Sequence, residues 1–180
     1  MITARHKRGI DIVIPGFGEL RTKVVCSDYT GTLSCEGKLI RGVRQRLRRL
    51  ASVVDIHIVT SDTRKTAGRE LATLTQTRRL TLVDASPSKM DHAAFKLAYI
   101  ENLEVALAEI AVFGNGRNDV KWLKAVNDAG GLAVAVDVGE GCATDAIINA
   151  NVFVSGITNA LDLLLDKHRI IGTLRTASDT

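Results

Sequence analysis

The sequence has few aromatic residues, few cysteines and no long apolar run, and each shortage excludes a class of protein. Phe, Trp and Tyr make up 4% of the chain, and Leu, Ile, Val and Ala dominate instead. This composition fits a sheet buried between helices better than an antiparallel sandwich. Cys26, Cys35 and Cys142 lie far apart with no Cys-x-x-Cys pair, so we expect free thiols. No stretch approaches the roughly 20 apolar residues that cross a bilayer.

The chain is long enough for one hydrophobic core and too short for two ordinary domains. It has 180 residues, 46% of them hydrophobic, so we expect a single domain spanning residues 1–180, with a core from about residue 10 to 174 and a polar, disordered C-terminal tail. Met1 to Arg8 lack the apolar stretch of a secretion signal, and we therefore expect a cytoplasmic protein.

The net charge of +4 comes largely from the first eight residues and from one arginine-rich segment. Five arginines fall between residues 41 and 49: Arg41, Arg44, Arg46, Arg48 and Arg49. Such a run usually forms a solvated helix face, and no aromatic residues are interleaved with it. We do not expect a nucleic-acid partner, although anion or nucleic-acid binding by this helix is an alternative.

Strand and helix patterns alternate along the chain at the pace of βαβ units. A β-hairpin from residue 10 to about 22 precedes the first buried strand, and the loop that follows leads to an amphipathic helix from about residue 43 to 54. Further strands are predicted at residues 56–59, 80–83, 110–113, 132–136 and 152–154, and helices at about 64–74, 88 or 91–103, 118–126, 143–150 and 159–165. The predicted fold is a three-layer, Rossmann-like α/β sheet with helices on both faces and no large cap.

Polar clusters follow several of these strands, at the sheet edge where such folds carry their sites. Asp28 ends the first buried strand, and a buried carboxylate requires a cationic partner. Asn115 and Asp119 follow the fourth strand, and their oxygens together with Asp28 suit Mg²⁺. Gly31 and Thr32 offer backbone amides to phosphate oxygens, and Thr32 and Thr60 offer hydroxyl donors.

The order of these clusters resembles the motifs of the haloacid dehalogenase superfamily, and within it the phosphorylation domain of P-type ATPases. Asp28-Tyr29-Thr30-Gly31-Thr32-Leu33 is similar to Asp-Lys-Thr-Gly-Thr-Leu, Thr60-Ser61-Asp62 resembles Thr-Gly-Asp, and Gly114-Asn115-Gly116-Arg117-Asn118-Asp119 resembles Gly-Asp-Gly-x-Asn-Asp. The resemblance implies a Mg²⁺-dependent phosphatase or phosphotransferase of the small P-type-ATPase-like group, acting on a small phosphorylated substrate.

The resemblance also implies roles for individual residues. Asp28 would attack phosphorus, Thr60 with Ser61 and Asn118 would bind the phosphoryl group, and Asp28, the Thr30 carbonyl, Asn115 and Asp119 would hold Mg²⁺. A lysine would steady the charge, and two candidates stay open. Lys96 matches the ATPase spacing, whereas Lys89 lies nearer the expected helix start.

Two positions depart from the family pattern. Thr30 stands where most phosphatases of the superfamily carry an acid-base aspartate, which implies slow hydrolysis and a preference for good leaving groups. Asn115 stands where the ATPase pattern has an aspartate ligand, which implies weaker metal binding. The alternative function is therefore a catalytically weak phosphate-binding or scaffold protein on the same fold.

The short spacing between motifs excludes an ATPase. Only 27 residues separate Thr32 from Thr60 and 28 separate Thr60 from Lys89, so neither interval holds a nucleotide-binding domain or a large cap. An open site accepts a bulky substrate or is covered by a neighbouring subunit, so a homo-oligomer is an alternative.

Overall fold

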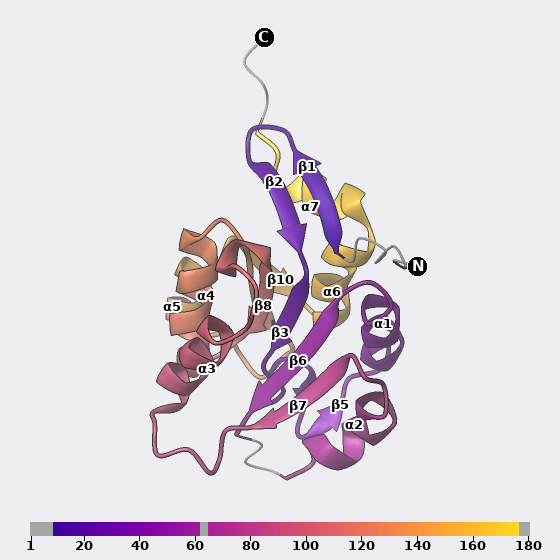
Figure 1. Ribbon diagram of the computed structural model, residues 1–180, viewed down its shortest axis with the longest axis vertical. Helices are drawn as coiled ribbons and strands as arrows, with labels where there is room; N and C mark the ends of the chain where they lie inside the picture. The colour runs from indigo at the N-terminus through magenta and orange to yellow at the C-terminus, as the bar shows by residue number, and fades with distance from the viewer. Residues whose placement is uncertain (1–8, 62–64, 177–180) are drawn as a thin grey trace, which may run out of the picture.

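A six-stranded parallel sheet forms the centre of the molecule in the computed structural model, which describes residues 9–61 and 65–176 (Figure 1). The strand order is β10-β9-β8-β3-β6-β7, and every pairing is parallel. The strands are Val24–Ser27 (β3), Asp55–Thr60 (β6), Leu80–Asp84 (β7), Ile110–Gly114 (β8), Leu132–Asp137 (β9) and Val152–Ser155 (β10). The predicted Rossmann-like α/β class is confirmed.

Helices cover both faces of the sheet. One face packs against α1, α2 and α6, and the other against α3, α4 and α5 (Figure 1). Successive residues of a strand point to opposite faces, so in β6 Ile56 and Ile58 join the first cluster and Val59 the second. The helices are Val43–Leu50 (α1), Ala67–Thr75 (α2), His92–Glu101 (α3), Val120–Asp128 (α4), Thr144–Ile148 (α5) and Ile157–Leu165 (α6).

An antiparallel hairpin of β1 (Ile10–Ile14) and β2 (Gly18–Thr22) opens the described chain, as predicted. It packs against α7 (Lys167–Leu174), a helix that the sequence analysis did not predict. Asp166 begins this helix by accepting a hydrogen bond from the His168 amide, and Ile170 is its buried contact. The helix buries an apolar surface of the hairpin that the sheet does not reach.

The loop after β3 contains a second small hairpin, β4 (Ser34–Cys35) with β5 (Lys38–Leu39), where the sequence analysis expected only a loop. The remaining elements are two 3₁₀ turns, η1 (Leu107–Glu109) and η2 (Arg117–Asp119). Among the described residues no connection between sheet strands holds a cap domain. In the same part of the chain, every helix is too short or too polar to cross a bilayer.

The chain reverses its direction across the sheet at β3. From β3 it proceeds outward to β6 and β7, and then returns to the other side of β3 to form β8, β9 and β10. The carboxyl ends of β3 and β8 are therefore neighbours at the point of reversal. In open parallel sheets this crevice is where ligands bind.

Candidate active site

Asp28 lies at this crevice. It follows β3 directly, and its amide donates a 2.9 Å hydrogen bond to the Phe113 carbonyl of β8. The residue is 4% exposed. The two adjacent strands thus fix the carboxylate at the carboxyl edge of the sheet.

Lys96 meets Asp28 from the helix layer. Its Nζ lies 2.9 Å from Asp28 Oδ1 and 2.6 Å from Asp119 Oδ1. Ala93, Lys96 and Ile100 are the buried residues of α3, so the lysine lies on the helix face that packs on the sheet. The ring of Trp122 lies 5.0 Å from Nζ and adds a favourable cation–π contact.

Asp119 holds the loop after β8 as well as Lys96. Its Oδ2 accepts hydrogen bonds from the amides of Asn115 (3.0 Å) and Gly116 (2.9 Å), while its Oδ1 faces Lys96. A Cβ added at Gly114 would lie 2.5 Å from the Asp119 side chain. The glycine at that position is required because the carboxylate folds back over the backbone.

The buried charges do not balance. Two carboxylates share one ammonium group, which leaves one negative charge in excess. Burial raises the pKa of Asp28 to about 6, although Lys96 acts to lower it. Burial also acts to lower the pKa of Lys96, but Asp119 and Asp28 outweigh that effect and raise it above its ordinary value. The ammonium therefore stays charged, and the three side chains together carry a net negative charge.

The loop after Asp28 makes a close contact with Asn115. Gly31 adopts a positive φ of 73°, and a Cβ there would lie 2.6 Å from Asn115 Nδ2. The Thr32 hydroxyl donates to Asn115 Oδ1 (3.2 Å), and Asn115 Nδ2 donates to the Gly141 carbonyl (3.2 Å). These bonds orient the amide oxygen of Asn115 within the crevice.

Gly31 and Thr32, which were predicted to contact phosphate, use their donors within the protein in this structure. The Gly31 amide donates to the Ser34 carbonyl (3.1 Å) and the Thr32 amide to the Tyr29 carbonyl (3.3 Å), and the Thr32 hydroxyl is engaged by Asn115. The tight turn uses these donors to close itself. Among the described residues, the Thr30 amide has no such acceptor.

Of the remaining predicted residues, one adjoins Asp119 in η2, and the other described ones lie outside the segments that carry Asp28, Lys96 and Asp119. Thr60 is buried at the end of β6, and the Ser61 carbonyl accepts a 2.7 Å hydrogen bond from Ser86 Oγ. Asn118 is half-buried in η2, with its Oδ1 folded over Gly116. Lys89 is exposed in the loop between β7 and α3. Asp62 lies outside the described residues.

A hollow of about 450 Å³ opens beside Thr60. Leu82, Asp84 and Ser86 from the end of β7 line one part of it, and Lys65 with the first residues of α2 lines another. Asp84 accepts hydrogen bonds from both the amide and the hydroxyl of Ser86. The hollow therefore offers polar and apolar contacts next to the crevice.

The donor set of the crevice suits a hard cation. In the described part of the chain no group of three His, Cys, Asp and Glu side chains comes together, so a metal ion would depend on Asp28 and on neutral oxygens of Thr30 and Asn115. Both Asp119 oxygens already have partners. Hard divalent cations such as Mg²⁺ and Ca²⁺ take oxygen ligands of these kinds in proteins.

The sequence analysis missed the loop that supports Asn115 from behind. The Asn115 carbonyl accepts from the Ala143 amide (2.8 Å), and its side chain reaches Gly141. Gly139 and Gly141 have positive φ and both donate to Asp137 Oδ1. The signal was present, because this glycine-rich loop follows β9 at the same edge of the sheet.

No protein-family model matches the chain. The chain is 35% identical to the uncharacterized protein MJ0073 of Methanocaldococcus jannaschii over 82 residues, which are 44% of this chain and 84% of that protein. Its structure is similar to the haloacid dehalogenase-like hydrolase SP0104 of Streptococcus pneumoniae, with a TM-score of 0.58 and 12% identity over 79% of this chain and 98% of the other.

A further similar structure is the cobalt-bound deoxy-D-mannose-octulosonate 8-phosphate phosphatase of Haemophilus influenzae. It has a TM-score of 0.61 and 14% identity over 87% of this chain and 94% of that protein. At these identities the two solved structures establish the fold.

The excess charge predicts that Asp28→Asn stabilises the protein at neutral pH. A carboxyl whose folded pKa is near 6 costs stability as the pH rises from its unfolded pKa of about 4 through 6. Asn stays neutral over this range. The free energy of unfolding of Asp28→Asn, relative to wild type, should therefore rise by about 1–3 kcal/mol between pH 4.5 and 7.5. Urea unfolding in EDTA measures it. Asp55→Asn, at an exposed carboxylate, is the control, and an equal change in both variants contradicts the prediction.

Proposed function

The chain belongs to one family with the archaeal protein MJ0073 and shares the fold of haloacid dehalogenase-like hydrolases, and on this premise we propose that it is a Mg²⁺-dependent phosphatase or phosphotransferase acting through Asp28. The supporting observation is the buried contact of Asp28 with Lys96, which Asp119 shares, at the reversal point of the sheet. A nucleophilic carboxylate beside a fixed ammonium is suited to phosphoryl transfer.

The first step transfers the phosphoryl group to Asp28. A carboxylate oxygen attacks phosphorus, the bond between phosphorus and the leaving oxygen breaks, and that oxygen departs with the electron pair. Lys96 offsets the negative charge that gathers between the two carboxylates and the phosphoryl oxygens. The Thr60 hydroxyl and the Thr30 amide would donate to the phosphoryl oxygens.

The second step releases the product. Water, or an acceptor hydroxyl, attacks phosphorus of the aspartyl-phosphate, the bond to Asp28 breaks, and a proton passes to solvent. Thr30 holds no carboxyl group to donate a proton to the leaving oxygen or to accept one from water. The enzyme should therefore favour weakly basic leaving groups such as acyl and aryl phosphates.

The proposed Mg²⁺ ligands are Asp28, the Thr30 carbonyl and Asn115. When bound, Mg²⁺ would neutralise charge on the phosphoryl oxygens. Asp119 would contribute through a water molecule, because both of its oxygens are engaged by Lys96 and by two amides. Its main part in this arrangement is to position Lys96 and the loop of Asn115.

The substrate is proposed to be a small phosphorylated molecule. The hollow beside Thr60 would hold its leaving part, with Asp84, Ser86 and Lys65 as polar contacts. The solved phosphatase of Haemophilus influenzae acts on a sugar-acid phosphate, as its name states. A second subunit over the open site is compatible with the same proposal.

The alternative of a weak phosphate-binding protein has one observation in its favour. Both ends of the Asn115 amide are already hydrogen-bonded, to Thr32 and to Gly141, and the side chain brings no charge to a cation. Slow chemistry with intact phosphate binding would follow from this geometry.

Turnover tests the main proposal directly. Acetyl phosphate and p-nitrophenyl phosphate should be hydrolysed with Mg²⁺ and not with EDTA, and Asp28→Asn should lower the rate at least about 100-fold because the nucleophile is lost. Asp55→Asn is the folded control. Turnover that persists in Asp28→Asn refutes the proposal. If wild type is inactive while Mg²⁺ with beryllium fluoride raises its melting temperature, the weak binding protein is favoured.

A matched pair of variants tests which of the two lysines, Lys96 or Lys89, acts in the reaction. Lys96→Met should lower turnover at least about 100-fold, because a fixed charge at the phosphoryl group is lost, whereas Lys89→Met should change it less than about twofold. Lys96→Met also leaves two buried carboxylates unpaired, which destabilises by about 3–5 kcal/mol. The double variant Lys96→Met with Asp119→Asn has the same net buried charge as wild type. It shows whether turnover is lost in a protein without Lys96 that still folds. Loss of activity in Lys89→Met would reverse the assignment.

Adding a carboxyl group at residue 30 tests the leaving-group argument. Thr30→Asp should raise the hydrolysis of an alkyl phosphate such as glycerol phosphate at least about tenfold, because a general acid contributes about 10²–10⁴-fold. Acetyl phosphate should respond less, since its leaving group needs no proton. Thr30→Asn has similar size and no acid, and an equal gain in that variant contradicts the argument.

A further inference from the structure

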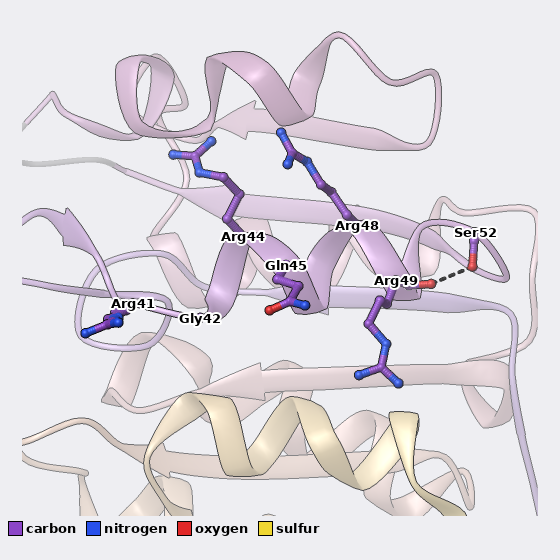
Figure 2. A pocket seen from close by; sticks show the side chains of 7 residues that line it. All are labelled: Arg41, Gly42, Arg44, Gln45, Arg48, Arg49 and Ser52. Atoms are coloured by element: carbon purple, nitrogen blue, oxygen red, sulfur yellow. Dashed lines mark hydrogen bonds between the residues drawn. The ribbon is translucent and has the colours of Figure 1, made fainter.

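Helix α1 and the residues at its two ends line an open hollow of about 640 Å³ on the molecular surface (Figure 2). Four arginines, Arg41, Arg44, Arg48 and Arg49, dominate its lining, and we call them the arginine face. Arg44 and Arg48 reach to one side of the helix and Arg49 to the other, with Gln45 between them (Figure 2). The arginines belong to a different surface from the Asp28 crevice.

The charge of the arginine face is compensated only in part: after Arg46, the positive charge of Arg49 also contributes to lowering the pKa of Asp162. The rest of its lining is uncharged, and none of the four guanidinium groups has an ion pair within the described chain. Arg44 donates to Thr73 Oγ1 and to the Glu70 carbonyl, which are neutral acceptors. By contrast Arg46, on the same helix, makes two 2.8 Å bonds to Asp162 and is neutralised.

Repulsion between the arginines destabilises helix α1. Like charges at i and i+4, as at Arg44 and Arg48, destabilise a helix by roughly 0.2–0.5 kcal/mol per pair. Arg44 near the N-terminus also opposes the helix dipole, and no acidic residue lies in the first turn, whereas Arg48 and Arg49 in the last turn interact favourably with it. A ligand with several negative groups would relieve this repulsion.

We propose that the arginine face binds the sugar-phosphate backbone of duplex nucleic acid without reading its sequence. Helix α1 has eight residues, about 12 Å along its axis, and Arg41 lies just before it. One DNA strand presents a phosphate about every 3.4 Å along its axis, so three or four phosphates match this length. Guanidinium groups also bind phosphate oxygens in pairs, which ammonium groups do not.

The divergence of the side chains disfavours a small anion. Arg48 and Arg49 extend away from each other (Figure 2), so a single phosphate would contact only part of the face. The lining holds no aromatic residue on which a base could stack. That absence, which led the sequence analysis to expect no nucleic acid, excludes base stacking and leaves backbone contacts available.

The test compares two triple variants with the same net charge. Arg41→Gln, Arg48→Gln and Arg49→Gln remove three of the four arginines of the face and keep Arg44, which ties α1 to α2. The control replaces exposed arginines elsewhere: Arg21→Gln, Arg69→Gln and Arg175→Gln. Binding of a labelled 16-base-pair DNA duplex of arbitrary sequence is measured by fluorescence anisotropy between 50 and 200 mM KCl.

Wild type should bind with a slope of log affinity against log salt of about −2.7 to −3.6, for three or four phosphates. The arginine-face variant should bind at least about tenfold more weakly at 100 mM KCl, with a slope reduced by about 2.7, because three charges are lost. The control should stay within about twofold. Unchanged acetyl phosphate turnover and an unlowered melting temperature would show that the variant is folded.

Three results would overturn the proposal. Wild type could fail to bind the duplex at 50 mM KCl, or both triple variants could lose affinity equally, which would show a general charge effect. In the third result, polyglutamate of equal charge would displace the duplex from wild type as well as unlabelled duplex does, which would assign the face to an acidic protein segment.

Discussion

The contact of Lys96 with two buried carboxylates is the interaction on which the site depends. It joins the end of β3, the middle of α3 and the loop after β8, three elements that are distant in sequence. Burying charges is costly, and removing one partner from such a group leaves an uncompensated charge. The single ammonium therefore fixes the relative positions of Asp28 and Asp119 and leaves one negative charge for a cation to meet.

The backbone had to adapt to bring these groups together. Asp119 folds over Gly114, and Asn115 approaches Gly31, at distances that leave no space for a Cβ. Gly31 also takes a left-handed conformation that other residues adopt with difficulty. The glycines next to the polar residues thus allow close packing at the crevice, and the polar residues supply its charge and hydrogen bonds.

Periodicity predicted most of the fold, because buried parallel strands and amphipathic helices leave clear patterns. Asp28 and Asn115 could be selected from the sequence because polar residues follow buried strands there. The choice between Lys96 and Lys89 needed the structure, which places Lys96 on the inward face of α3. The hydrogen bonds that the Gly31 and Thr32 amides make within the turn could not be predicted, because residue types do not specify the backbone conformation of a turn. Likewise α7 was missed, since its partner is the distant hairpin β1–β2.

The two departures from the family pattern have a shared electrostatic consequence. With aspartates at residues 30 and 115, the crevice would hold up to four carboxylates and one lysine. Burying that excess of negative charge without substrate would be costly unless a metal ion were bound. Thr30 and Asn115 reduce that number to two, so the crevice holds one negative charge in excess of its lysine. Lower repulsion in the resting protein and weaker acid-base and metal chemistry therefore have the same cause. The positions that limit the proposed reaction are the ones that lower the energetic cost of burying Asp28.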